Sequence, residues 1–251
     1  MEWVQMKTSD SAYTGSRFCP YIDAVRHSIQ ITFASASQFS QLDLKQDLPT
    51  DFVEMFNRAI LYLLWHQFYA IAARGVLSPY LPLFRICNNS GVATLTDKDS
   101  GSGHKTRLVW MPPELLKHMQ QMEDRIQVFR AQHEIRWDLE QSPVFFLKDD
   151  LKPLEIGPKE IERLCRGFFP FPANTSRRVM RFMLDDAGLS SESVEMYLGH
   201  WRDRREPWGK WSSFDCSTYL DNLRLYIPRI LSDLGFQCPP EQRKRKTTNG
   251  K

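Results

Sequence analysis

Residues 51–75 read DFVEMFNRAILYLLWHQFYAIAARG and hold the strongest periodic signal in the sequence. Apolar side chains recur there at helical spacing, at Phe52, Phe56, Ile60, Leu63, Leu64, Phe68 and Ile71. This spacing predicts an α-helix. Thr50 or Asp51 can cap its first turn through a side-chain oxygen, and we expect the helix to end near Ala73 or Arg74.

A β-hairpin and a long helix are predicted to follow. Residues 91–96 and 106–111 have the composition of strands, and the segment 97–103 between them is rich in Asp, Ser and Gly. Two such strands around a polar loop indicate an antiparallel hairpin. The pair Pro112-Pro113 then favours the start of a helix that reaches about residue 133, because proline is tolerated in a first helical turn.

Three short helices and one longer helix complete the predicted elements. The short helices span residues 158–166, 175–187 and 191–200. Gly188 is well placed as the C-terminal cap of the second one. The last helix runs from about residue 217 to 231, and Pro228 bends it or begins a second piece. The predicted fold class is therefore mostly α with a small antiparallel β-sheet (α+β).

The sequence divides into three regions. Residues 1–49 are rich in Ser, Thr and Gln without a sustained helical period, so we expect a linker or a truncated N-terminal arm. Within it, residues 34–40 are predicted to be a loop or a short extended piece. Residues 50–235 are the expected domain, and a hydrophobic content of 42% is sufficient for a core. Residues 236–251 are predicted to be a basic, disordered tail.

The net charge of +3 is too small to identify a partner, but its distribution is uneven. Much of the positive charge lies in the last third of the sequence, in clusters at residues 177–181, 202–205 and 243–246. A basic strip of this kind can bind a polyanion through phosphate contacts that tolerate any sequence. Each cluster taken alone fits solvated surface arginines equally well.

Cysteine usage and apolar content exclude several classes of protein. The five cysteines are odd in number and irregularly spaced without a CxxC pair, which argues against a disulfide framework or a zinc site. Reduced thiols and an N-terminus without a signal-peptide pattern favour a cytoplasmic protein. The longest apolar stretch, residues 59–73, is interrupted by Trp65-His66-Gln67 and is too short and polar to span a bilayer, so no membrane partner is expected.

Polar residues at the ends of the predicted elements are the candidates for chemistry. Arg74 ends the first helix, where a buried guanidinium needs an anion. Lys98 lies in the hairpin loop and can reach a phosphate as a mobile point charge. Asn174 and Arg177 lie at a helix start, whose free amides favour anions, and His200 ends the following helix. Taken singly, each residue also has an ordinary interpretation as a helix cap or a solvated side chain.

In chain order these residues resemble the signature of the tyrosine recombinases, the phage integrase family. That signature is an arginine, a hairpin lysine, His-x-x-Arg, Leu-Gly-His and a tyrosine. Arg74 and Lys98 are 24 positions apart, and Arg177 and His200 are 23 positions apart. Both separations are typical of the family. Tyr219 is the tyrosine that the resemblance identifies as the nucleophile.

Longer segments carry the same resemblance. Residues 105–112 (KTRLVWMP) resemble the family's second hairpin strand and the start of its next helix. Ala187-Gly188-Leu189, followed by Leu198-Gly199-His200, resembles a further stretch of the pattern. The resemblance covers residues 50–232 and implies the helical fold of a tyrosine recombinase catalytic domain.

Two positions depart from the family pattern. The histidine of His-x-x-Arg is replaced by Asn174, which can bind a phosphate oxygen but cannot accept a proton as imidazole does. Tyr219 follows His200 by 19 residues, about twice the usual gap, because residues 201–213 form an insertion. Tyr219 is preferred because it opens the last helix, as the family's nucleophile does. Tyr226 is the alternative nucleophile, and Tyr219 also fits a half-buried packing residue.

The resemblance implies a site-specific DNA recombinase or integrase of a mobile genetic element, which cuts and rejoins DNA through a 3′-phosphotyrosyl intermediate. It needs no cofactor and no metal. The implied catalytic residues are Arg74, Lys98, Asn174, Arg177, His200 and Tyr219. Tyr219 would attack the phosphate and Lys98 would protonate the leaving 5′-oxygen. The expected partners are double-stranded DNA and further copies of the protein in a synaptic complex, in the cytoplasm at the nucleoid.

Other functions remain open from the sequence. A type IB topoisomerase or a telomere resolvase would use the same phosphotyrosyl chemistry. A catalytically impaired DNA-binding protein of the same fold is favoured by Asn174. A helical scaffold with a basic tail for RNA or acidic proteins predicts that Arg74 and Arg177 lie far apart. The recombinase interpretation instead predicts that all six side chains line one basic concave face.

Overall fold

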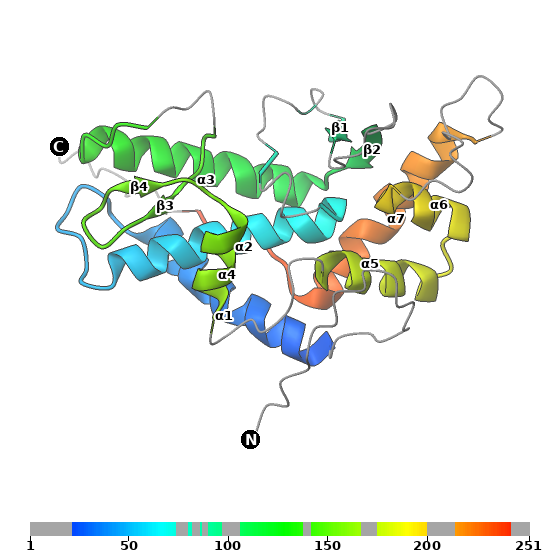
Figure 1. The fold of residues 1–251 in the computed structure, drawn as a ribbon, viewed down its shortest axis with the longest axis horizontal. Helices are drawn as coiled ribbons and strands as arrows, with labels where there is room; N and C mark the ends of the chain where they lie inside the picture. Colours follow the sequence, from blue (N-terminus) through cyan, green and yellow to red (C-terminus); the bar gives the residue numbers. More distant parts are fainter. Residues whose placement is uncertain are drawn as a thin grey trace, which may run out of the picture.

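A computed structural model describes residues 22–73, 80–81, 86, 90–96, 106–137, 142–166, 175–199 and 214–241. Within these ranges the protein is mostly helical and has two small antiparallel hairpins (Figure 1). The predicted α+β class is therefore confirmed. The helices and strands that the sequence predicts begin and end within three residues of their expected bounds.

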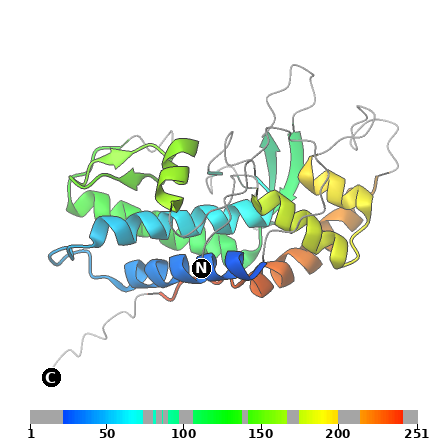
Figure 2. The same ribbon diagram turned by 60° about the horizontal axis from the view of Figure 1, so that its bottom comes forward.

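The central element is α2 (Phe52–Ile71), and all but three of its 20 residues are buried. α1 (Ile22–Gln41) and α3 (Pro113–Gln132) pack along it (Figures 1 and 2). A helix that is covered on all sides can be apolar on all sides, which explains the strength of its sequence signal. Asp51 is the N-cap residue, but its side chain makes no capping hydrogen bond, contrary to the capping prediction.

Different elements cover the two ends of α2 (Figures 1 and 2). The hairpin of β3 (Phe146–Leu147) and β4 (Pro153–Leu154) contacts its N-terminal half, and α4 (Pro158–Cys165) also packs against α2. The elements at its C-terminal end are β1 (Val92–Thr96), β2 (Thr106–Trp110), α5 (Thr175–Asp186), α6 (Ser191–Leu198) and the first turn of α7 (Cys216–Leu234).

α1 occupies part of the region that the sequence analysis assigns to a linker or a truncated N-terminal arm. Residues 22–41 form a helix there, so the predicted loop at 34–40 is wrong. The hydroxyl groups of Ser28 and Thr32 donate to carbonyls of their own helix at 2.9–3.0 Å. Small polar residues are therefore satisfied within the helix although they are buried, and their polarity hides the helical period.

Residues 236–241 also belong to the fold rather than to the predicted tail. Phe236 is buried and stacks on the ring of His66, with the ring centroids 4.9 Å apart. The hydroxyl of Tyr62 donates to the carbonyl of Gln237 at 2.7 Å and accepts from its amide at 2.8 Å. Beyond residue 241 the predicted tail lies outside the described residues.

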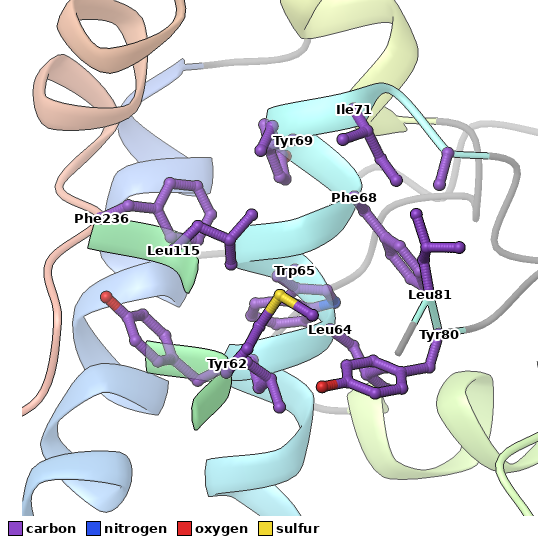
Figure 3. Packing of buried hydrophobic residues seen from close by; sticks show 14 of the residues in the cluster. Tyr62, Leu64, Trp65, Phe68, Tyr69, Ile71, Tyr80, Leu81, Leu115 and Phe236 are labelled. Atoms are coloured by element: carbon purple, nitrogen blue, oxygen red, sulfur yellow. The ribbon is translucent and has the colours of Figure 1, made fainter. Parts of the chain in front are cut away.

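The core runs along the whole of α2. At its N-terminal half the rings of five phenylalanines contact one another, with centroids 5.1–6.2 Å apart: Phe39, Phe52, Phe56, Phe129 and Phe145. Further along, Phe236 lies beside Leu115 and Tyr69, while Tyr80 and Leu81 lie against the other side of α2 (Figure 3). The core thus fixes α2 as the axis on which both ends are built.

Candidate functional site

α2 ends in a strained turn at which three other elements meet. Ala72 adopts the left-handed conformation (φ 45°, ψ 43°), which costs a residue with a Cβ roughly 1–2 kcal/mol. Its carbonyl accepts hydrogen bonds from Arg107 Nη2 of β2, at 3.0 Å, and from Arg177 Nη1 of α5, at 2.7 Å. The shared acceptor holds β2 and α5 against the end of α2.

The same two arginines reach the C-terminal end of α6. Arg107 Nη1 donates to the carbonyl of Tyr197, and Arg177 Nη2 donates to the carbonyl of Leu198 at 2.5 Å. We name the two guanidinium groups and the carbonyls of Ala72, Tyr197 and Leu198 the arginine clamp. It joins the ends of two helices that are 126 residues apart in the chain.

The electrostatics of the arginine clamp follow from its place between helix ends. Arg107 is 1% exposed and Arg177 is 7% exposed, so both guanidinium groups are removed from water. Burial of a charge costs several kcal/mol unless other groups compensate it. The last carbonyls of a helix lack partners within the helix and carry partial negative charge. The two helix ends therefore stabilise the two cations.

The first turn of α5 directs Arg177 inward. Arg177 lies on the same helix face as Met180 and Leu184, three and seven positions later, and both of these are fully buried. Arg178 is exposed, and Arg181 is half exposed and forms an ion pair with Glu195 at 2.7 Å. The basic cluster at 177–181 is thus one buried arginine and two surface arginines rather than a continuous basic strip.

α6 is docked on the last turn of α2 by a second set of contacts. The hydroxyl of Tyr197 lies 2.8 Å from the carbonyl of Tyr69 and 2.9 Å from that of Ala70, and it donates to this pair. Burial raises the pKa of the Tyr197 phenol well above its usual range, although nearby Arg107 opposes the shift. Gly199 then ends α6 in the left-handed conformation at φ 65°.

Tyr219 lies in the first turn of α7, where the side chain of Asp215 accepts a hydrogen bond from the amide of Ser217. The Tyr219 hydroxyl donates to the carbonyl of Leu108 in β2 at 3.1 Å, and the residue is 1% exposed. Burial raises the pKa of the phenol well above its ordinary value near 10, and Arg107 acts in the opposite direction. In this arrangement the phenol is neutral and shielded from solvent.

The six predicted site residues fall into two groups. Arg74, Lys98, Asn174 and His200 lie outside the described residues. Arg177 and Tyr219 are described, and both are buried, so neither of them lines an open face in this structure. The prediction of a concave face made by all six residues stays a prediction.

The described residues next to the predicted ones do come together. Ala72 precedes Arg74 by two residues, and Leu198 precedes His200 by two. Both carbonyls bind Arg177 directly. Tyr219 binds the strand residue that follows Arg107. The ends of α2 and α6, the first turns of α5 and α7, and β2 therefore meet around one pair of arginines.

Sequence reasoning missed the central residue of this site, Arg107. It noted the residue only as part of a segment that resembles a hairpin strand. The sequence holds one local signal, because Arg107 and the apolar Val109 are two positions apart and therefore lie on the same face of the predicted strand. A charged side chain at the position of an inward-facing apolar one indicates a buried charge with dedicated partners.

The described ranges hold no group of metal ligands and no membrane-spanning helix. No group of three or more His, Cys, Asp or Glu side chains suited to a metal ion occurs among these residues. None of the helices in the described part of the chain has the length and apolar character to cross a membrane. Cys165, Cys216 and Cys238, the cysteines in these ranges, are free thiols.

Comparisons with protein-family models, curated proteins and solved structures found no match to this chain. The functional assignment therefore depends on the residues and on the geometry of the arginine clamp.

Proposed function

We propose that the protein is a tyrosine recombinase that breaks and rejoins double-stranded DNA through a 3′-phosphotyrosyl link formed by Tyr219. The observation that carries the proposal is the meeting of β2, two helix ends and two helix starts at the arginine clamp. Residues from the ends of several elements that converge on one place are what a multi-residue active site requires. The helical-scaffold alternative predicts that Arg74 and Arg177 lie far apart, whereas Arg177 donates to the carbonyl two residues before Arg74.

The proposed reaction balances without a cofactor. The Tyr219 oxygen bonds to the scissile phosphorus, the bond from phosphorus to the 5′-oxygen breaks, and a second 5′-hydroxyl later reverses the step. Lys98 supplies the proton for the leaving oxygen, and water takes the phenol proton, because Asn174 cannot accept it as an imidazole would. Arg74 and Arg177 neutralise the charge that builds up on the phosphate, with Asn174 and His200 as further donors.

The reaction also requires a movement of Tyr219 and of the residues that cover Arg177, because both side chains are buried. The Tyr219 hydroxyl is held by the Leu108 carbonyl and is shielded from solvent, so attack on DNA requires that this hydrogen bond is exchanged for the phosphate. The hydrogen bond contributes about 0.5–1.5 kcal/mol, and burial of the Tyr219 ring contributes roughly 1.5–3 kcal/mol more. Specific DNA binding exceeds non-specific binding by about 4–10 kcal/mol, so DNA binding that displaces the first turn of α7 can offset this cost.

The test is capture of a covalent protein–DNA adduct. Because the target sequence is not known, the protein is incubated with a pool of nicked duplexes that have a randomised centre. Complexes that survive denaturation in detergent are isolated and sequenced. We expect specific duplexes to be enriched, and we expect nucleotide-bearing peptides that contain Tyr219. Absence of any adduct would contradict the proposal.

Two substitutions of tyrosine by phenylalanine identify the nucleophile. Tyr219→Phe should abolish the adduct, whereas Tyr226→Phe should leave its yield unchanged. The reverse pattern would assign the reaction to Tyr226 and retain the class of enzyme. Relaxation of supercoiled plasmids regardless of their sequence would instead assign the protein to the type IB topoisomerases.

A second candidate function is favoured by the same burial of Tyr219. A DNA-binding protein of this fold that has lost catalysis would have no need of an accessible phenol, and Asn174 is consistent with that loss. It predicts duplex binding that weakens steeply with salt and no covalent adduct. The adduct assay combined with a binding measurement therefore separates the two candidates.

A further inference from the structure

Arg107 is the least exposed charged residue of the described structure, and the proposed mechanism assigns it no role. It lies on β2, directly opposite Leu95 of β1 in the antiparallel register. It is among the largest side chains that are fully buried. A leucine or methionine would fill such a position at lower cost, because it would need no compensation for a buried charge.

Two hydrogen bonds of the Arg107 guanidinium connect the segments that lead to other proposed catalytic residues. One bond reaches the carbonyl of Ala72, two residues before Arg74, and the other reaches the carbonyl of Tyr197, three residues before His200. The next residue of its strand, Leu108, accepts the hydrogen bond of Tyr219. Arg107 is therefore bonded, directly or through its neighbour, to three of the segments that meet at the site.

Arg107 and Arg177 also share an acceptor. Both donate to the Ala72 carbonyl, so Arg107 limits the positions that the Arg177 guanidinium can take. The planar guanidinium forms this pair of bonds in fixed directions, which the ammonium of a lysine cannot reproduce. Phosphate-binding cations must be placed to within a fraction of an ångström, and two guanidinium groups bonded to one carbonyl restrict their positions in this way.

We propose that Arg107 is a positioning residue for DNA cleavage, which aligns Arg177 and the ends of α2 and α6 with the scissile phosphate without touching it. This inference rests on the proposed function. It predicts that loss of Arg107 slows formation of the phosphotyrosyl link far more than it weakens DNA binding.

The experiment compares Arg107→Met with a matched control, Arg125→Met. Arg125 is a half-buried arginine of α3 that donates to the carbonyl of Leu42 at 2.6 Å, near the opposite end of α2. The single-turnover rate of adduct formation, corrected for the folded fraction, and the equilibrium affinity for the same duplex are measured for both variants. We expect Arg107→Met to slow adduct formation by about 100-fold and Arg125→Met by less than about twofold, with affinities within about threefold of wild type.

A substrate with a neutral methylphosphonate at the scissile position distinguishes positioning from a merely structural role. A merely structural role would leave the ratio of wild-type to variant rates the same on the charged and the neutral substrate. If Arg107 acts through the cations that neutralise the phosphate, removal of the phosphate charge should make these cations less important. The rate of adduct formation by wild type should then exceed that of Arg107→Met by about tenfold or less. The same ratio of the two rates on both substrates would overturn the inference. If Arg107→Met does not fold, Arg107→Lys serves in its place, with an expected loss of at least about tenfold.

The possible outcomes separate this inference from the proposed function. Equal rates for the Arg107 and Arg125 variants, in a protein whose wild type forms the adduct, would overturn the positioning role and leave the recombinase proposal intact. A wild type that forms no adduct on any duplex would overturn both.

Discussion

The two ends of α2 are held by different kinds of interaction. The N-terminal half packs its own Phe52 and Phe56 against three phenylalanine rings of other elements. Its Asn57 side chain also accepts from the amide of Leu147 at 2.7 Å and donates to the carbonyl of Leu147 at 2.8 Å. The C-terminal end is held by two buried guanidinium groups and a left-handed alanine. One end is held mainly by apolar packing and neutral hydrogen bonds, while the other is held by two buried charges and a strained residue.

This difference indicates that the N-terminal half of α2 mainly stabilises the fold and that its C-terminal end fixes the geometry of the site. Apolar packing stabilises a fold at little electrostatic cost, so a protein that needed only stability could build both ends in that way. Buried charge and strain at a junction of several elements are instead typical of sites where geometry matters more than stability. Substitutions at the N-terminal half should therefore change stability alone, and substitutions at the arginine clamp should change activity as well.

The largest effect is expected for Phe56→Ala, in the middle of the phenylalanine cluster. Loss of a fully buried ring leaves a cavity and should lower the free energy of unfolding by about 3–5 kcal/mol. Chemical denaturation measures this change, and Phe182→Ala on the exposed face of α5 is the control, with a change below about 0.5 kcal/mol. If the rate of adduct formation per folded molecule also falls, the N-terminal half of α2 does not affect stability alone.

The next largest effect is expected for Asn57→Leu. The substitution leaves the amide and the carbonyl of Leu147 buried without partners, which should cost about 2–4 kcal/mol. Gln120→Leu removes an exposed amide bond to Asp124 and should change the unfolding free energy by less than about 0.5 kcal/mol. Equal effects of the two substitutions would show that the Asn57 contact does not hold the β3–β4 hairpin.

Between the two ends, α2 and α3 share a buried histidine pair whose stability should depend on pH. His66 and His118 lie with their Nδ1 atoms 3.2 Å apart, so one ring must donate to the other in neutral form. Burial lowers the pKa of His66 to about 3, and burial together with His66 lowers the pKa of His118 well below its ordinary value.

Protonation of this pair favours the unfolded chain, in which a histidine titrates near pH 6.5. Stability is therefore complete above about pH 6.5, and it should fall by up to about 1.4 kcal/mol per pH unit for each proton bound as the pH drops from 6.5 towards 3. Denaturant titrations between pH 5 and 7.5 measure the slope. The double variant His66→Leu/His118→Leu should reduce the slope of unfolding free energy against pH, whereas exposed His27→Gln should not. Equal slopes in the wild type and both variants would show that the histidine pair does not cause the pH dependence.

The smallest change in stability is expected for Tyr219→Phe at the arginine-clamp end. The variant loses one hydrogen bond to the Leu108 carbonyl, worth about 0.5–1.5 kcal/mol, and keeps the packing of the ring. Thermal denaturation measures the loss beside Tyr226→Phe as the control. A small loss of stability together with complete loss of the adduct would be the opposite of the result expected for Phe56→Ala. Destabilisation beyond about 3 kcal/mol would instead indicate that Tyr219 is chiefly a packing residue.

The sequence predicts well those elements whose signal is local. Residues 52–71 carry a helical period that burial on all sides reinforces, and Gly188 ends α5 at φ 85° as predicted, because only a residue without a Cβ takes that conformation at no cost. α1 escaped prediction because the hydroxyl groups that interrupt its apolar period are satisfied by its own backbone. The β3–β4 hairpin escaped because its strands have only two residues each.

The candidate site was predictable only in part, for a physical reason. Arg177 and Tyr219 could be identified by their order and spacing, which are properties of the chain. The burial of both residues depends on partners more than 100 positions away, Ala72 for the arginine and Leu108 for the tyrosine. Arg107 was missed for the same reason, because the two helix ends that it binds are distant from it in the sequence.

The position of residues 233–241 has a consequence for how the chain folds during synthesis. Arg26 at the start of α1 donates to the carbonyl of Asp233, and Ser40 at the end of the same helix donates to that of Pro240. The first described helix thus finds some of its partners only after about two hundred further residues have left the ribosome. At the usual pace of translation this leaves the flank of α1 uncovered for about ten seconds or more, an interval in which exposed apolar surface favours aggregation.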